Sequence, residues 1–320
     1  MKFDTLIIGG GLAGLTCGIR LQKNGVKCAI VSTGQSALHF SSGSFDLLNE
    51  LADGTKVDNP VAAADKVGAN HPYAKLGDNF AYYVREAKQQ FLDCGIEVNG
   101  DAEHNHLRIT PMGTLKPTWL TFSDFTPLSS ANDIAGKKIL VVNMAGFLDF
   151  NTKFVADSFE KYGAECRISS INLPELERLR ISPTEMRSTN IARVLENEKT
   201  LEALILELTG KISGFDIVAL PAVFGLSSAA SVKKLKESLD IPVWLIPTMP
   251  PSVPGIRAQQ QLRRSFEELG GVYMLGDTVV KADFSGNKVQ AVYSVNHGDI
   301  SFVAENFVLA SGSYFSNGLI

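Results

Sequence analysis

The sequence predicts an α/β fold in which a sheet of the nucleotide-binding type is interrupted by an inserted α/β region. At the start of the chain, the apolar run Leu6–Ile8 leads into a glycine-rich turn and then into an amphipathic segment, which is the order strand, turn, helix. Strand and helix patterns alternate again between residues 138 and 246, which predicts a second, parallel sheet. A last apolar strand, Asn306–Ala310, leads into Ser311-Gly312-Ser313.

The glycine-rich turn predicts a phosphate-binding site. Gly9, Gly11 and Gly14 match the pattern G-x-G-x-x-G between a strand and a helix. Gly9 permits the tight turn, Gly11 lets a phosphate approach the backbone, and Gly14 lets the helix pack closely on the strand. Backbone N–H groups and the positive end of the helix then face the anion. The cofactor-binding residues expected here are Gly9, Gly10, Gly11, Leu12, Ala13 and Gly14.

The second strand, Lys27–Val31, ends without the acidic residue that usually binds the ribose of an adenine dinucleotide. Ser32 and Thr33 stand at that position instead. Two interpretations remain open. Either a hydroxyl of Ser32 or Thr33 binds the ribose, or the ligand is a mononucleotide such as FMN and has no adenosine half. No arginine stands nearby to receive a 2′-phosphate, which argues against NADP.

Between the two ends of the chain, the patterns predict two inserted regions. The first contains a helix over Asn79–Cys94 and a hairpin that pairs Ile96–Val98 with Leu107–Thr110. The second contains one long helix over Thr189–Thr209. The expected domains are a discontinuous nucleotide-binding domain at 1–50 and 251–320, an α+β insertion at 51–130, and an α/β domain with a parallel sheet at 131–250.

The composition is that of an ordinary globular protein, since 45% of the 320 residues are hydrophobic and 20% are charged. The net charge of −4 gives no support for nucleic-acid binding. No apolar run approaches the roughly 18 residues that span a membrane, and the first strand begins too early for a signal peptide, so we expect a cytoplasmic protein. None of the four cysteines forms a C-x-x-C pair, so no metal site is expected.

The C-terminal turn resembles an element of flavoproteins with two dinucleotide folds. In those proteins, the N-terminal glycine-rich turn is completed much later by a strand that ends in an Ala-Thr-Gly-like turn, and Val308–Gly312 looks like that element. The resemblance implies an FAD/NAD(P)-binding Rossmann-like fold of the GR2 type, and it implies that Ala310, Ser311 and Gly312 contact the cofactor. Such flavoproteins carry a further C-terminal segment that closes on the flavin, and we expect this segment to be absent from the 320 residues.

Three segments, at 35–48, 111–120 and 247–266, resemble the B-subunit family of the anaerobic glycerol-3-phosphate dehydrogenase. The resemblance implies a complex that oxidises sn-glycerol 3-phosphate to dihydroxyacetone phosphate and passes electrons to the membrane quinone pool. It implies FMN in the B subunit, FAD in a partner A subunit, and a third, iron–sulfur C subunit that holds the pair at the membrane. The missing carboxylate after the second strand agrees with FMN better than with FAD. The alternatives are a stand-alone flavin oxidoreductase and a flavin-fold scaffold without a redox role.

The loop after the second strand is expected to face the flavin. Its small and hydroxyl residues, Ser41, Ser42, Gly43 and Ser44, allow close approach to a cofactor, although a serine-rich surface loop would look the same. His39 is a weak catalytic candidate that could hydrogen-bond the ring or attach it covalently, as a histidine does in fumarate-reductase relatives. Arg257 is a second weak candidate, either as a phosphate ligand or as a plain surface cation. No catalytic base can be named.

Overall fold

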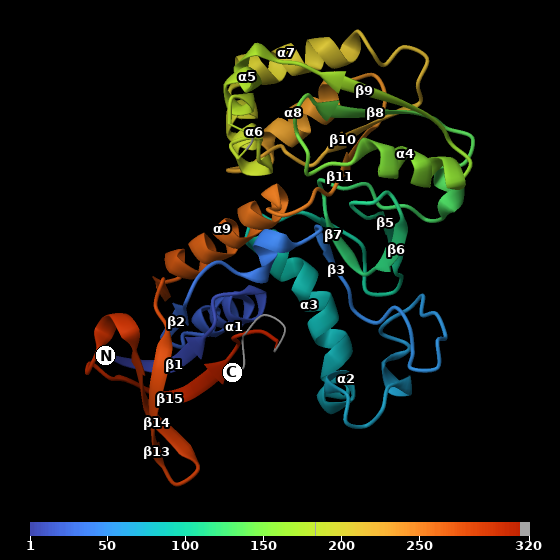
Figure 1. The fold of residues 1–320 in the computed structure, drawn as a ribbon. Helices are drawn as coiled ribbons and strands as arrows, with labels where there is room; N and C mark the ends of the chain where they lie inside the picture. The colour runs from blue at the N-terminus through green and yellow to red at the C-terminus, as the bar shows by residue number, and fades with distance from the viewer. Residues whose placement is uncertain (183, 314–320) are drawn as a thin grey trace. The chain divides into compact units, whose positions relative to one another are not determined.

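The computed structural model describes residues 1–182 and 184–313. Its contacts divide the chain into two compact units (Figure 1). The first unit combines Met1–His39 with the chain from Ala258 onward, and the second unit is Phe40–Arg257. The first unit is therefore discontinuous, whereas the second is one uninterrupted stretch of sequence. The finer division of the inserted region at residues 130 and 131 stays a prediction.

The first unit contains a six-stranded sheet in the order β12-β2-β1-β15-β14-β13 (Figure 1). The neighbouring strands β12, β2, β1 and β15 are parallel to one another. The strands β14 and β13 extend the sheet in antiparallel pairing beyond β15. Its strands are β1 (Lys2–Ile8), β2 (Cys28–Ser32), β12 (Val272–Leu275), β13 (Val279–Ser285), β14 (Lys288–Ser294) and β15 (Phe302–Leu309). The first and last of these strands along the chain are neighbours, with Ile7 opposite Val308.

Two helices lie in the part of the first unit that the structure describes. Helix α1 (Leu12–Lys23) follows β1 directly and buries Leu15 and Ile19 completely. Helix α9 (Val253–Glu268) begins in the second unit and continues into the first. Close packing between α1 and α9 depends on Gly18, because a Cβ at that position would meet the buried ring of Phe266. Short 3-10 turns η1 (Ala37–Phe40) and η4 (Val295–His297) follow β2 and β14.

The second unit contains a four-stranded parallel sheet in the order β11-β10-β8-β9 (Figure 1). The parallel sheet predicted from the alternating pattern is therefore present. Its strands and helices are β8 (Lys138–Met144), α4 (Thr152–Lys161), β9 (Glu165–Ile171), α5 (Pro174–Arg180), α6 (Ser188–Leu195), α7 (Glu198–Thr209), β10 (Ile217–Pro221), α8 (Ala230–Ser238) and β11 (Val243–Ile246). The single long helix predicted at 189–209 is wrong, because the side chain of Asn197 caps a new helix by accepting the Thr200 N–H.

The rest of the second unit holds two small sheets and two helices. The elements are β3 (Ser44–Phe45), η2 (Ala64–Lys66), α2 (Pro72–Leu76), α3 (Asn79–Asp93), β4 (Val98–Asn99), β5 (His106–Ile109), β6 (Leu115–Thr118), β7 (Leu120–Phe122) and η3 (Ala131–Asp133). The hairpin predicted between 96–98 and 107–110 is wrong. Val98 pairs with Phe122 in the sheet β3-β7-β4, and β5 pairs with β6 across the tight turn that joins Thr110 to Thr114.

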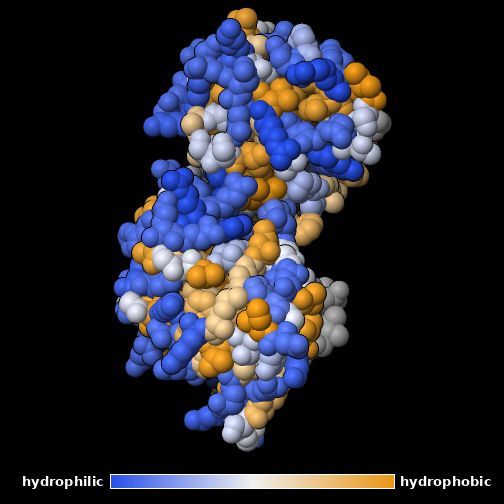
Figure 2. All heavy atoms as spheres, turned by 90° about the vertical axis from the view of Figure 1, so that its left-hand side faces the viewer, coloured by the Kyte–Doolittle hydropathy of each residue, from blue (hydrophilic) through white to orange (hydrophobic). Residues whose placement is uncertain are grey.

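The surface carries hydrophobic residues among hydrophilic ones, as the face in Figure 2 shows. Exposed apolar side chains of the first unit include Val280, Phe284 and Leu309. Of the helices within 1–182 and 184–313, none combines the length and the apolar character needed to cross a membrane.

Candidate flavin site

The glycine-rich turn is built around Gly9. This residue has φ +117°, in the region that favours glycine, and its N–H donates to the carbonyl oxygen of Val31 at 2.8 Å. A Cβ on Gly9 would overlap the backbone of Ala310 and Ser311. The Ala310 N–H donates to the Ile8 carbonyl at 2.7 Å, so the two turns predicted from opposite ends of the chain lie against one another.

The start of α1 is shaped by Gly11 and Gly14. A Cβ on Gly14 would overlap the carbonyl oxygen of Gly9, so the helix packs directly on the turn only with glycine at this position. Gly11 is the N-cap residue, and a Cβ there would meet only Ser36, at 3.5 Å. Among the described residues, no side chain caps this helix end and no acidic side chain stands in its first turn. The positive end of α1 is therefore available to an anion.

The hydroxyl groups predicted to bind ribose have partners within the chain. Ser32 is buried, and its Oγ donates to the Gly34 carbonyl at 3.0 Å. Thr33 Oγ1 accepts a hydrogen bond from Thr278 Oγ1 at 3.1 Å. The loop after β12 also contacts this strand end, since the Gly276 N–H donates to the Ser32 carbonyl at 2.8 Å.

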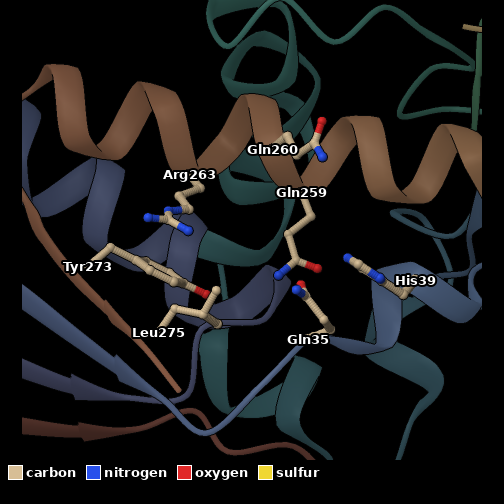
Figure 3. A pocket seen from close by; sticks show the side chains of 7 residues that line it. All are labelled: Gln35, His39, Gln259, Gln260, Arg263, Tyr273 and Leu275. Atoms are coloured by element: carbon tan, nitrogen blue, oxygen red, sulfur yellow. The ribbon is translucent and has the colours of Figure 1, made fainter. Parts of the chain in front are cut away.

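A pocket of about 140 Å³ lies in the first unit beside the glycine-rich turn (Figure 3). Its lining comes from the loop after β2, from α9 and from β12, and consists of Gln35, His39, Gln259, Gln260, Arg263, Tyr273 and Leu275. The Tyr273 hydroxyl donates to the Gly10 carbonyl at 3.0 Å, which joins the pocket to the turn. Figure 3 shows the amide groups of Gln35 and Gln259 pointing toward one another. The pocket thus presents amide donors and acceptors where related nucleotide sites have a carboxylate.

Arg263 and Tyr273 form a further contact in the pocket. The guanidinium carbon of Arg263 lies 4.8 Å from the centre of the Tyr273 ring, and the same side chain pairs with Glu267. Sequence reasoning missed the pocket residues on α9 and β12. The run Gln259-Gln260-Gln261 in the middle of a helix was a signal, because amides are seldom placed beside buried residues without a polar partner.

The loop predicted to face the flavin divides between the two units. Ser36 donates from its Oγ to Gln259 Oε1 at 2.7 Å, and His39 lines the pocket. Burial lowers the pKa of His39, so its imidazole is neutral at pH 7. The four residues from Ser41 to Ser44 belong to the second unit, where Gly43 has φ +84° and donates its N–H to Ser41 Oγ at 3.0 Å.

Arg257, the second catalytic candidate, is buried in the second unit. Its side chain is 6% exposed and forms an ion pair with Asp124, whose side chain is 3% exposed. The guanidinium also donates to the Gly225 carbonyl oxygen. The interpretation of Arg257 as a surface cation is therefore wrong, and the groups that a phosphate would need are already engaged.

The residues of the turn fit a phosphate-bearing cofactor. The described first unit brings together Gly9–Gly14, Ser32, Thr33, His39 and Ala310–Gly312. Ser311 Oγ is buried and has no hydrogen-bond partner within 1–182 and 184–313, which leaves a free hydroxyl beside the glycine-rich turn. A cofactor phosphate would satisfy the free N–H groups at the start of α1. No group of three histidine, cysteine or acidic residues in the same ranges could hold a metal ion.

Comparison with known proteins identifies the family. The model of the FAD binding domain family matches residues 4–320 and shows that this is a flavin-binding fold. A 3-ketosteroid Δ1-dehydrogenase from Sterolibacterium denitrificans aligns over 97% of this chain and 48% of its own, with 13% identity and a TM-score of 0.40. The B subunit of the anaerobic glycerol-3-phosphate dehydrogenase from Yersinia enterocolitica is 44% identical over 325 residues, which cover all of this chain and 77% of the relative. The B subunit from Pectobacterium atrosepticum is 43% identical with the same coverage. The glycine-rich turn, the closing turn and the sequence identity agree. The chain therefore belongs to the flavoprotein family formed by the B subunits of anaerobic glycerol-3-phosphate dehydrogenases.

Proposed function

We propose that this chain is a flavoprotein subunit of an anaerobic glycerol-3-phosphate dehydrogenase complex. The complex oxidises sn-glycerol 3-phosphate to dihydroxyacetone phosphate and passes the electrons to the quinone pool. The observation that carries the proposal is the closed turn of Gly9 and Ala310 in a chain 44% identical to a named B subunit of such a dehydrogenase. A bound flavin supplies the two-electron chemistry, and the protein supplies binding and electrostatics.

The first unit would hold the flavin phosphate at the start of α1. The N–H groups from Gly11 to Gly14 and the positive end of the helix stabilise the negative charge. The hydroxyl of Ser311 provides an additional donor from the closing turn. The approach of Ser41, Ser42, Gly43 and Ser44 to the flavin ring stays a prediction that the resemblance to the family implies.

We assign FAD rather than FMN as the cofactor. The absent carboxylate after β2 favoured FMN, but the pocket beside Gly10 offers the amides of Gln35 and Gln259 as partners for ribose hydroxyls. The ring of Tyr273 and the neutral His39 supply further surface for an adenosine group. The matching family is also one of FAD binding domains.

The proposed partners are an A subunit that carries FAD and an iron–sulfur C subunit that holds the assembly at the membrane. The protein would then be cytoplasmic and held peripherally at the inner face of the cell membrane through these partners. A candidate base for the C2 hydroxyl of the substrate does not emerge from the described residues.

The experiment begins with mass spectrometry of the flavin extracted from the purified protein. We expect FAD, and FMN would refute that assignment. Gly14→Ala places a methyl group against the Gly9 carbonyl and should abolish flavin retention. The matched control is Gly34→Ala, because a Cβ at Gly34 meets nothing within 4 Å and should leave the flavin content unchanged.

Activity separates the proposed function from its alternatives. We expect glycerol 3-phosphate to reduce an artificial acceptor only when the A subunit is present. Strong turnover by the isolated chain would favour a stand-alone oxidoreductase. A full complex that lacks flavin in this chain would favour a scaffold role.

A further inference from the structure

A second polar cluster lies on the hairpin β5–β6 in the second unit. Strand alternation puts His106 and Arg108 on one face of β5, and their partners across the hairpin are Thr118 and Lys116. The opposite face carries the apolar residues Leu107, Ile109, Leu115 and Pro117. One face of this hairpin is therefore polar throughout, although Arg108 and Thr118 on it are buried.

Arg108 is the unusual member of the cluster. The residue is 7% exposed, and its Nε and Nη1 atoms are buried without a hydrogen-bond partner among the residues that the structure describes. Burial lowers the pKa of Arg108 and the nearby Asp46 raises it, but a guanidinium stays protonated at neutral pH. Native structures rarely leave such groups unpaired, so this cation is placed to receive an anion.

The carboxylate near Arg108 is already engaged. Asp46 Oδ1 accepts a hydrogen bond from Thr118 Oγ1 at 2.8 Å, and Asp46 Oδ2 forms an ion pair with Lys116. Arg108 and Lys116 are two cations near the single carboxylate of Asp46, so these three residues together carry a net positive charge. The side chains of Lys116 and Asp46 are 46% and 34% exposed, so the cluster is open to solvent on their side.

His106 lies on the same face of β5 as Arg108. His106 Nε2 lies 3.2 Å from Thr121 Oγ1, and burial lowers the pKa of His106 and keeps its ring neutral at pH 7. Guanidinium and ammonium groups together with hydroxyls are the groups by which proteins bind phosphate.

We propose that the polar face of β5–β6 binds a phosphate monoester through Arg108 and Lys116. The inference rests on the proposed function, since the phosphate of sn-glycerol 3-phosphate is the phosphate monoester of that reaction. Arg108 donates to the phosphate oxygens from its unpaired guanidinium. Lys116 contributes a second cation at the mouth of the site, and Asp46 holds Lys116 in place between binding events.

The test measures ligand binding to the purified flavin-loaded protein by calorimetry. The probes are sn-glycerol 3-phosphate, inorganic phosphate and glycerol. We expect both phosphates to bind and glycerol not to bind. Arg108→Met should raise the dissociation constant for glycerol 3-phosphate about ten- to hundred-fold, because a hydrogen-bonded charge is lost. The control Arg85→Met removes a surface arginine paired with Glu103 and should leave the constant unchanged.

Thermal unfolding gives a second, independent readout. A guanidinium that waits unpaired for a ligand destabilises the free protein, so ligand-free Arg108→Met should melt at the same temperature as the parent or higher. A structural arginine would give the opposite shift. Failure of the Arg108→Met variant to fold would count against the proposal. The variant Arg108→Lys keeps the positive charge but replaces the planar guanidinium with an ammonium group, so it should bind phosphate more weakly than the parent.

The outcomes separate the site from the proposed function. Unchanged binding in the Arg108 variants, or equal binding of glycerol, overturns the site even if the complex oxidises glycerol 3-phosphate. Binding of either phosphate that depends on Arg108, without any flavin reduction in the assembled complex, supports the site and overturns the function.

Discussion

The buried ion pair of Arg257 and Asp124 allows a quantitative prediction for Asp124→Asn. The substitution keeps the shape of the side chain and removes its charge. Arg257 would then remain a buried cation that donates to the neutral Gly225 carbonyl. The charge of Lys236 lies nearby, because its Nζ contacts the carbonyl oxygens of Ser123 and Asp124 at 3.0 and 2.8 Å. Both cations would therefore lose the negative charge of the Asp124 carboxylate.

The expected loss follows from the burial of both side chains. Removing one partner of a buried pair costs about 3–5 kcal/mol in the free energy of unfolding. For a unit of roughly 200 residues, each kcal/mol corresponds to about 2–4 °C in melting temperature. We therefore expect Asp124→Asn to lower the melting temperature of the second unit by about 6–20 °C.

Urea unfolding and calorimetry on the purified protein measure this loss. The matched control is Asp157→Asn, because Asp157 pairs with Lys153 on the surface and its side chain is 44% exposed. That change should cost about 0.5 kcal/mol or less. The double variant Asp124→Leu with Arg257→Met should lose less free energy of unfolding than Asp124→Asn, because neither charge of the pair is then left without its partner. Equal losses for Asp124→Asn and the surface control would refute the reasoning.

Three further predictions concern other sites. Gly43→Ala should lower the free energy of unfolding of the second unit, measured in urea, by about 1–3 kcal/mol. The reason is that Gly43 has φ +84° and the ring of Phe125 fills the space of the new Cβ. Burial raises the pKa of Asp277, but hydrogen bonds from Ser294 and His297 outweigh it and hold that pKa below its ordinary 3.8. This stabilisation is present above pH 3.8 and is lost as the pH falls further, so Asp277→Asn should flatten the acid limb of a stability–pH curve. Burial raises the pKa of Cys28 to about 11, so thiol reagents at about pH 8 should label the native protein there far more slowly than the urea-unfolded protein.

The strand, turn and helix at residues 2–23 could be predicted because their signals are local. The apolar run, the three glycines and the helical spacing occupy one continuous stretch, and the structure has β1 and α1 there. The parallel sheet of the second unit was predictable for the same reason, since each strand and helix carries its own periodicity. The break between α6 and α7 was also visible, because Asn197 stands directly before Glu198 as a helix-capping residue would.

Partners that lie far apart in the sequence could not be predicted. Asp124 precedes Arg257 by 133 residues, and no local pattern indicates that the two charges meet. Tyr273 contacts Gly10 across 263 residues, so the pocket beside the turn exists only in the folded chain. The wrong hairpin has the same origin. Val98 has the periodicity of a strand, but periodicity does not say that Phe122 is its neighbour.

The pairing of β1 with β15 sets an order for events during protein synthesis. The N-terminal amino group donates to the Ser301 carbonyl at 2.7 Å, across 300 residues of sequence. A ribosome that adds about 5–20 residues per second makes β1 roughly 15–60 s before its partner strand. The whole of Phe40–Arg257 emerges in that interval and can fold as a unit. During that interval β1 can pair with β2, but the edge of β1 that faces β15 stays without its native partner until the last strand arrives.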